Sequence, residues 1–470
     1  MSSKLLINTA NMKGTLICLF ILLFFLINNI SAQNKLPRIK VSENKRFLCL
    51  EDGKPFFWLG DTAWELFLKL TPEESELYFS DRKSKGFNLI QITILSENDH
   101  HTIDATNHMG FSPLLNQNPA TPDVKPGENN DYWDHVDRVI KLAESKGLYI
   151  GLLPTWSEYV TTEYRDGVVN SIFNVNNAFV YGKFVGERYK NFTNIIWILG
   201  GDRSASSDDA KNVWRAMARG LATGITGHED YSQMLMTYHP VGQQHSTDDF
   251  PNEPWIDFNA IQSGHGSMVL NWEMVQEDYK AYNEKPIIDL ESCYPFIATC
   301  GQKVNSDDYA ARRAAYWSVF SGSFGHTYGH HGIWNFVTKS ENPNIIWKNA
   351  INAVSSTQMG YLKELMESFP FFERIPDQSI ISSNPDFEVD HIAATRGENY
   401  VLIYLPNCRP VVVQMGKIKG QHVNCKWFNP RNNKYQEIGT IENNGLKTFT
   451  PPKLGKTEEP EDWVLVLETK

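Results

Sequence analysis

Two carboxylates in this 470-residue sequence each follow a short apolar run. Residues 195–201 lead to Asp202, and residues 286–290 lead to Glu291. Both runs are typical of strands that are covered on both faces, as in a parallel α/β sheet. An acid at the carboxyl end of such a strand lies where barrel enzymes carry their chemistry. Two acids that converge on one site are the minimum needed to cleave a glycosidic bond.

The strands that must position these acids recur along the chain. The apolar runs are 56–60, 89–94, 148–153, 195–199, 234–238, 258–262, 287–290 and 325–328. Helical patterns separate them, at 71–85, 131–146, 178–189, 208–220, 272–283 and 307–320. Thr71 and Pro72 open the first of these as an N-cap and a first-turn proline. Eight alternations in roughly 300 residues predict a (β/α)₈ barrel. No G-x-G-x-x-G follows the first strand, which argues against a dinucleotide-binding open sheet.

In a barrel, the residues just past each strand face one shared pocket. The candidates for substrate binding are Asp61, Trp64, Trp156, Arg203, His239, His265, Tyr294, His330 and Trp334. Such polar and aromatic side chains suit the hydroxyl groups and the ring face of a sugar. For Asp61, capping of the first helix is an equally good interpretation.

The fourth and seventh strands lie roughly opposite each other, so we assign Asp202 as acid/base and Glu291 as nucleophile. The acid must be protonated, through burial or a neighbouring negative charge. An ion pair of Asp202 with Arg203 is the structural alternative. Asp289 lies one pleat before Glu291, so we expect it to point the same way and to pair with a neighbour or influence the nucleophile. A carboxyl separation of about 5–5.5 Å is expected for a retaining mechanism.

The histidines do not indicate a metal site. His100-His101 and His330-His331 are adjacent pairs whose side chains diverge on a strand or loop. Residues 60–62 read Gly-Asp-Thr where a metal-dependent amidohydrolase barrel has H-x-H, and there is no H-E-x-x-H. We therefore expect no metal and no cofactor.

Composition narrows the range of partners. The net charge of −11 argues against nucleic acid, which requires a basic surface. Aromatic residues make up 12% of the chain, with 13 tryptophans, which fits either sugar-stacking surfaces or a large core. The expected partner is a polysaccharide or oligosaccharide, and we expect a monomer.

The N-terminus has the pattern of a signal peptide. Lys4 and Lys13 precede a dozen apolar residues at 16–27, too few to span a bilayer. We place cleavage after Ala32 and expect a periplasmic or secreted protein without a membrane anchor. The exported chain keeps five cysteines, of which Cys293 with Cys300 and Cys408 with Cys425 are the pairings nearest in sequence.

Near residue 370 the sequence pattern changes from alternating strands and helices to short strands with turns. This change predicts a barrel domain over 33–370 and a second domain over 371–470. Short strands are expected at 387–394, 400–405, 411–415, 423–428, 447–450 and 463–467, with turn clusters between them. This pattern indicates a small all-β sandwich. The connection contains Phe369, Phe371 and Phe372, which we expect to pack against both domains.

Three segments carry a resemblance to a known family. Residues 46–48 and 53–64, which end in Trp-Leu-Gly-Asp-Thr-Ala-Trp, resemble the opening of the apiosidase-like barrel domain. Residues 196–202 and 286–291 look like its two catalytic segments. The region after Pro370 resembles a β domain named for collagen binding. The resemblance covers nearly the whole exported chain.

The resemblance implies glycoside hydrolase activity. Relatives in glycoside hydrolase family 140 release apiose-linked side chains from the pectin rhamnogalacturonan II, and their catalytic Asp and Glu fall on Asp202 and Glu291. The first hypothesis is thus an exported, retaining endo-apiosidase on pectic glycan. The alternatives are a glycoside hydrolase on another polysaccharide and a non-catalytic glycan- or matrix-binding protein. The collagen name we discount in favour of structural support for the barrel.

Overall fold

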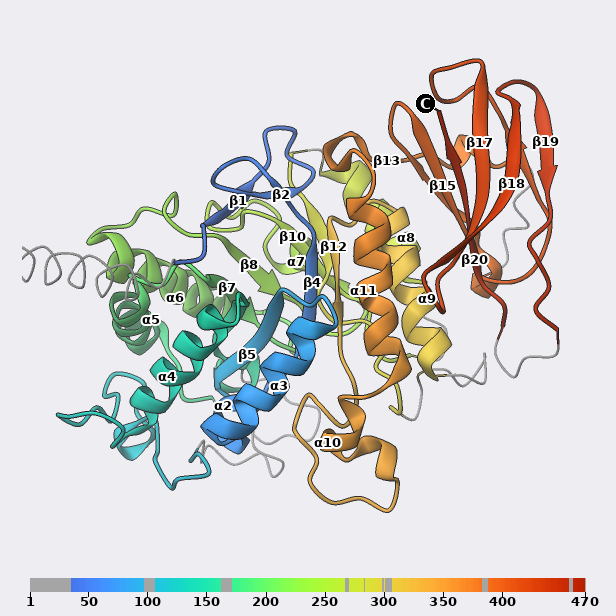
Figure 1. The fold of residues 1–470 in the computed structure, drawn as a ribbon. Helices are drawn as coiled ribbons and strands as arrows, with labels where there is room; N and C mark the ends of the chain where they lie inside the picture. The colour runs from blue at the N-terminus through green and yellow to red at the C-terminus, as the bar shows by residue number, and fades with distance from the viewer. Residues whose placement is uncertain are drawn as a thin grey trace, which may run out of the picture. The chain divides into compact units, whose positions relative to one another are not determined.

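A barrel of eight parallel strands is the framework of the protein (Figure 1). The computed structural model describes residues 35–96, 106–161, 171–266, 270–282, 284–297, 300, 307–382, 388–455 and 460–469. The barrel strands are β4 (Trp58–Thr62), β5 (Leu89–Leu95), β6 (Tyr149–Thr155), β7 (Ile195–Gly200), β8 (Met236–His239), β10 (Asn259–Gln262), β11 (Ile287–Asp289) and β12 (Gly325–Tyr328). Each of the eight predicted strands is present, so the barrel prediction is confirmed.

Two parallel sheets together close the barrel. One has the order β12-β4-β5-β6-β7-β8, and the other pairs β10 with β11. The backbone amide of Asp257 donates to Met236 O (2.8 Å) and that of Phe324 to Ile287 O (3.1 Å), which joins the sheets at both seams. A short strand β9 (Gln244–His245) adds antiparallel to β10.

Helices cover the outside of the barrel (Figure 1). They are α2 (Leu66–Lys69), α3 (Pro72–Ser84), α4 (Tyr132–Ser145), α5 (Val175–Tyr189), α6 (Asp208–Thr226), α7 (Ser246–Asp249), α8 (Asn271–Ala281), α9 (Asp307–Phe320), α10 (Trp347–Ala350) and α11 (Val354–Glu367). Thr71 caps α3 in a capping box with Glu74, as its sequence predicts. Helix α6 runs past Gly220, where we predicted its end, and stops before Gly227 at a φ of 88°.

The barrel interior is filled by side chains, so a ligand can enter only at its ends. The indole of Trp58 donates to Thr327 Oγ1 at 3.0 Å, and the carboxamide of Gln91 donates to the same oxygen at 3.0 Å. All three residues are buried. At the amino-terminal end of the strands lies an antiparallel sheet of β1 (Ile39–Val41), β2 (Leu48–Leu50) and β3 (Pro55–Phe56).

The second domain is a β-sandwich. Its larger sheet has the order β13 (Ile375–Pro376), β14 (Ala393–Arg396), β15 (Tyr400–Leu405), β20 (Trp463–Glu468), β17 (His422–Asn429) and β18 (Lys434–Glu442). The smaller pairs β16 (Val411–Gln414) with β19 (Leu446–Phe449). Buried residues of both sheets share one core, among them Val413, Ile403 and Leu465.

Two details of this domain differ from the predictions. The strand expected at 387–394 begins only at Ala393, because residues 388–390 form a 3₁₀ turn. Strand β18 was not predicted. Its side chains are exposed except for the half-buried Ile441, so the sequence lacks the alternation that marks a strand.

The two domains share a buried polar interface. Arg312 on α9 forms two hydrogen bonds of 2.9 Å with Asp462, and both side chains are fully buried. Arg431 and Tyr404 of the β domain also donate to Asp462, at 3.0 and 3.1 Å. This carboxylate is therefore satisfied by donors from both domains.

The connecting phenylalanines divide between the domains. The ring of Phe371 packs 5.0 Å from that of Phe47 in the barrel domain, and Phe369 packs 4.7 Å from Tyr400 in the β domain. Phe372 also contacts Phe47, at 6.0 Å.

The expected signal peptide lies outside the described residues. Among the residues that are described, no helix is both long and apolar enough to span a membrane.

Candidate active site

A cavity of about 320 Å³ lies at the carboxyl ends of the barrel strands. It is lined by Trp64, Glu65, Ser96, Trp156, Asp202, Arg203, His265, Glu291, Tyr294, Ile297, His331 and Trp334. Both predicted catalytic acids are in this lining. Strands β7 and β11 deliver them from different parts of the sequence, as the strand-end argument requires.

A strained turn presents Asp202 to the cavity. Gly200, Gly201 and Asp202 have φ values of 93°, 124° and 52°, all in the left-handed region. A Cβ atom on Gly200 would lie 2.2 Å from His239 O, and one on Gly201 would lie 2.5 Å from the Trp156 ring. The two glycines therefore let the strand end pass between its neighbours. Asp is one of the few other residues that tolerate this conformation.

Two histidines hold Glu291. His265 Nε2 lies 3.0 Å from Glu291 Oε1, and His239 Nε2 lies 3.2 Å from Glu291 Oε2. Glu291 is only 5% exposed, and His239 is fully buried. Each carboxylate oxygen thus has one imidazole partner, which fixes the orientation of the side chain.

The surroundings move the pKa values of the two acids in opposite directions. Burial alone would raise the pKa of Glu291, but the hydrogen bonds and charges of His239 and His265 lower it to about 2. For Asp202, desolvation in the cavity and then the negative charge of Glu291 raise the pKa, against a smaller opposite effect of Arg203. Two carboxyl groups in one cavity therefore favour different protonation states, the pattern of an acid and a nucleophile.

Most of the predicted substrate-binding residues lie in this cavity. Trp64, Trp156, Arg203, His265, Tyr294 and Trp334 line it. The Trp64 and Trp156 rings pack 5.1 Å apart and form an apolar wall, and Tyr294 packs 4.3 Å from His265. Aromatic walls beside carboxylates suit a sugar, whose ring presents apolar faces and polar edges. His239 does not line the cavity and acts through its contact with Glu291.

Asp61 does not reach the cavity, and a substrate-binding role for it is not supported. It is fully buried, and its carboxylate pairs with Arg82 and accepts a 2.6 Å hydrogen bond from Tyr78, both on α3. The amide of Thr62 donates to its other oxygen at 3.0 Å. Asp61 thus fastens β4 to helix α3 on the outside of the barrel.

Of the adjacent histidines after β12, His331 rather than His330 lines the cavity. His330 is fully buried, and its Nδ1 accepts a hydrogen bond from the Gly332 amide at 3.0 Å. Burial lowers the pKa of His330 to about 3. The predicted role of His330 is corrected accordingly: it is a neutral structural residue.

Two further residues near the acids were not among the predicted ones. Gln262, the last residue of β10, donates from Nε2 to Asp202 Oδ1 at 3.2 Å. Glu65 lines the cavity and pairs with Lys69 at 2.7 Å. Counting the last residue of each strand, and not only those after it, would have included Gln262.

Arg203 and the cysteines complete the surroundings. Arg203 lies 3.1 Å from Asp202 Oδ2, so the ion pair considered from the sequence exists inside the cavity.

A disulfide joins Cys293 to Cys300 and closes the loop that carries Tyr294 and Ile297. Cys49, Cys408 and Cys425 are free thiols.

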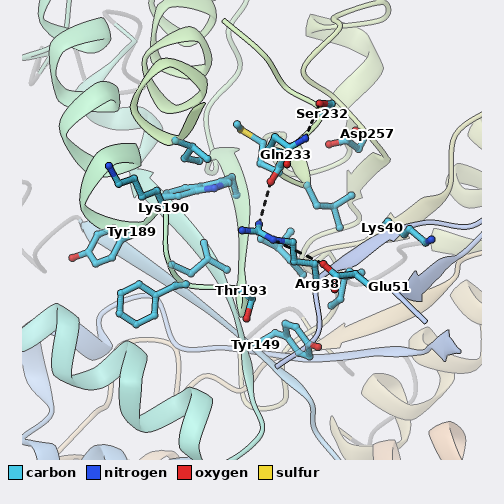
Figure 2. A pocket seen from close by; sticks show the side chains of 18 of the residues that line it. Arg38, Lys40, Glu51, Tyr149, Tyr189, Lys190, Thr193, Ser232, Gln233 and Asp257 are labelled. Carbon is cyan, nitrogen blue, oxygen red and sulfur yellow. Dashed lines mark hydrogen bonds and ion pairs between the residues drawn. The ribbon is translucent and has the colours of Figure 1, made fainter. Parts of the chain in front are cut away.

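A second cavity, of about 330 Å³, lies at the opposite, amino-terminal end of the strands (Figure 2). Arg38 lies in the middle of it, where it donates to Gln233 O at 3.1 Å and approaches Glu51 to 4.0 Å. The half-buried Asp257 in its lining accepts a hydrogen bond from the Met236 amide at 2.8 Å. The other acid in the lining of this base cavity, Glu51, is exposed and faces Arg38. Within the described part of the chain, no cluster of three or more His, Cys, Asp or Glu residues could hold a metal ion.

Comparisons with known proteins agree with this geometry. Residues 42–373 match the family described as "Apiosidase-like, catalytic domain", and residues 375–468 match "Putative collagen-binding domain of a collagenase". A solved structure of a glycoside hydrolase family 5 protein from Bacteroides vulgatus ATCC 8482 is 34% identical, over 92% of this chain and 93% of that one, with a TM-score of 0.81. Another, described as a glycoside hydrolase, is 36% identical over 92% of this chain and 97% of that one, with a TM-score of 0.80. The comparison with curated proteins finds no match.

The family match covers well over half of the chain and includes both strand ends that carry the acids. The two similar structures extend over both domains. The chain therefore belongs to the apiosidase-like catalytic-domain family, and it is a glycoside hydrolase with a carbohydrate substrate.

Proposed function

We propose that this glycoside hydrolase cleaves glycosidic bonds in plant pectic glycan by a retaining mechanism, with Asp202 as acid/base and Glu291 as nucleophile. The observation that carries the assignment is the pair of acids in one cavity whose pKa values move apart. The choice of sugar, an apiose-linked side chain of rhamnogalacturonan II, is supported by the family match.

In the first step, a carboxylate oxygen of Glu291 attacks the anomeric carbon while Asp202 gives its proton to the leaving oxygen. The bond from the anomeric carbon to that oxygen breaks, and a glycosyl-enzyme forms. In the second step, Asp202 takes a proton from water. The water oxygen attacks the anomeric carbon from the face that the leaving group vacated, and the bond to Glu291 breaks. Two inversions leave the anomeric configuration unchanged.

Neighbouring residues prepare both acids for these steps. His239 and His265 keep Glu291 ionised and oriented. Gln262 donates to Oδ1 of Asp202, and Arg203 contacts Oδ2. A nucleophile that is already ionised and held in place needs little reorganisation during the reaction.

The proposal includes export to the periplasm or the medium, where polysaccharides are met, and action as a monomer. The N-terminal pattern of two lysines and a dozen apolar residues supports export. Mass spectrometry of the protein recovered from its own host would show cleavage after Ala32, and light scattering would give its mass in solution. An intact N-terminus on the recovered protein would contradict export.

A glycan panel with product analysis tests the substrate. Release of an apiose-terminated oligosaccharide from rhamnogalacturonan II supports the proposal, and turnover of another polysaccharide alone identifies the second candidate. Proton NMR of the first-formed product gives its anomeric configuration. An inverted anomer would remove Glu291 from the nucleophile role and make it a base acting through water. Binding without turnover on every glycan would favour the non-catalytic candidate.

A further inference from the structure

A third carboxylate, Asp289, lies two residues before Glu291 and serves neither the cavity nor an ion pair. It is fully buried in β11 and is not in the cavity lining. Its Oδ2 accepts from Ser263 Oγ at 2.6 Å and from Asn271 Nδ2 at 3.1 Å, and its Oδ1 accepts from the Ser263 amide at 3.3 Å. The sequence suggested that Asp289 and Glu291 point the same way. They do not, because β11 ends at Asp289 and the alternation of the strand stops there.

These hydrogen bonds fix the turn that follows β10. Ser263 is held through both its backbone and its side chain, and Asn271, the first residue of α8, also donates to Ala314 O on α9 at 2.9 Å. On the other side of the turn, the amide of Gly264 donates to Glu291 O at 2.9 Å. The segment 263–264 is therefore anchored at each residue to β11 or to the loop after it.

The residue that this turn presents is His265. Its Nε2 lies 3.0 Å from Glu291 Oε1, and its ring packs against Tyr294 at 4.3 Å. A hydrogen bond of this length weakens steeply when its geometry is lost, so a displacement of about 1 Å would remove it. The position of the turn thus decides whether the nucleophile keeps one of its two imidazole partners.

We propose that Asp289 is a positioning residue, which holds the turn 263–264 so that His265 hydrogen-bonds the carboxylate of Glu291. This inference rests on the proposed role of Glu291 as nucleophile. A buried carboxylate that is bonded only by uncharged donors is costly for stability, and an apolar residue would pack there at lower cost. Burial raises the pKa of Asp289, which reflects that cost. In return for this cost, the carboxylate anchors the turn 263–264.

The first test measures His265 directly and needs no substrate. The titratable groups that face His265 are Glu291, Asp202, His331 and Tyr294. Burial alone would lower the pKa of His265, but its hydrogen bond to Glu291 and the negative charges of Glu291 and Asp202 raise it above the ordinary value. In Asp289→Asn, we expect the NMR titration midpoint of the His265 imidazole to move down toward about 6.5. Asp257→Asn, the same change in a half-buried carboxyl of the base cavity, is the matched control and should leave His265 unchanged.

The second test uses activity on the glycan identified by the panel. Asp289→Asn should lower kcat about 10- to 100-fold with little change in KM, because the loss falls on orientation of the nucleophile and not on binding. The acidic limb of kcat/KM should move to higher pH, since Glu291 loses a donor that lowers its pKa. In the double variant with His265→Ala, the two losses should not add, because both act on the same hydrogen bond.

The outcomes separate a positioning role from a merely structural one. If Asp289→Asn lowers the melting temperature but leaves the His265 titration and the acidic limb unchanged, the proposal is wrong. If Asp289→Asn does not fold, Ser263→Ala removes the 2.6 Å bond alone and should shift the same two readouts in the same direction. Full activity of Glu291→Gln would overturn the proposed function, whereas the His265 titration would still decide the role of Asp289.

Discussion

The cavities at the two ends of the barrel have nearly the same volume, about 320 Å³ at the carboxyl end and about 330 Å³ at the base. Each contains a partly buried acid with a raised pKa, Asp202 in one and Asp257 in the other. They differ in what surrounds that acid. At the carboxyl end, a second acid of opposite protonation preference shares the space. At the base, Asp257 is bonded to a backbone amide, and Arg38 crosses the interior (Figure 2).

This difference teaches that neither volume nor a shifted pKa identifies an active site in this protein. Burial raises the pKa of Asp257 to about 7 without any partner that could use its proton. In the cavity at the carboxyl end, the hydrogen bonds and charges of His239 and His265 outweigh the burial of Glu291 and lower its pKa, whereas the pKa of Asp202 is raised. Acid and nucleophile catalysis requires two carboxyl groups whose pKa values are shifted in opposite directions. The sheet geometry brings such a pair together at the carboxyl end of the barrel.

The largest effect is expected from Glu291→Gln. The amide cannot attack the anomeric carbon, so kcat should fall by roughly 10⁴-fold or more. The melting temperature should change little, since the amide keeps the shape of the side chain. Steady-state kinetics and thermal melting check this prediction. Asp257→Asn at the base is the matched control with wild-type kcat, and equal losses in the two variants would erase the distinction between the cavities.

Removal of the acid should cost less, in a way that depends on the leaving group. Asp202→Asn should lower kcat/KM about 10²- to 10⁴-fold on a natural glycan, the usual contribution of general acid catalysis. On a dinitrophenyl glycoside of the same sugar, the loss should be much smaller, because that leaving group departs as a stable anion. The comparison of the two substrates is the measurement. Equal losses on both would assign Asp202 to binding and not to proton transfer.

Asp257→Asn should change stability and its pH dependence. The pKa of Asp257 is about 7 in the folded protein, whereas an aspartate in an unfolded chain titrates near about 3.9. Between these values the folded state holds a proton that the unfolded state has lost, so this group makes stability fall as pH rises. Asparagine does not titrate, so in Asp257→Asn this decrease of the free energy of unfolding with rising pH is absent. Relative to wild type, the variant should gain up to about 4 kcal/mol in the free energy of unfolding above pH 7 and almost nothing near pH 4.

Denaturant unfolding at the two pH values measures this difference. A gain that is the same at both would mean that Asp257 is not titrating between them, and that the base cavity hydrates it like a surface carboxylate. Activity measured in parallel at neutral pH should equal that of the wild type.

The smallest effect concerns the alkaline side of the pH profile. Activity should fall as pH rises through the pKa of Asp202, because the ionised form has no proton to donate. Arg203 opposes the rise of that pKa. In Arg203→Gln, the alkaline limb of kcat/KM should therefore move to higher pH, by less than about one unit for a pair open to solvent. Arg215 on α6 pairs with Glu253 at the surface, and Arg215→Gln, which breaks that pair, is the matched control. A shift to lower pH would show that another group sets this limb.

Some features of the site were hidden from the sequence for a definite physical reason. Both faces of a barrel strand are buried, so the pattern of β4 does not tell which face Asp61 occupies, and it turned out to face helix α3. His330 and His331 are adjacent, and only the path of the loop after β12 decides that His331 lines the cavity. Strand β18 was missed because it has no buried face to produce an alternating pattern.

The sequence by itself determined the barrel and predicted the two acids that line the cavity at its carboxyl end. Apolar runs at eight places dictate buried parallel strands, and Gly200-Gly201 before Asp202 permits the left-handed turn that exposes the acid. These are local properties, set by burial and by backbone conformation within a few residues.

Only the tertiary structure decided which protonation states the acids favour and how the domains join. Glu291 takes its low pKa from His239 on β8 and His265 in the turn after β10, and Asp462 is satisfied by Arg312 from 150 residues away. Electrostatic interactions and hydrogen bonds depend on distance in space, and the spacing of residues along the chain does not contain that distance.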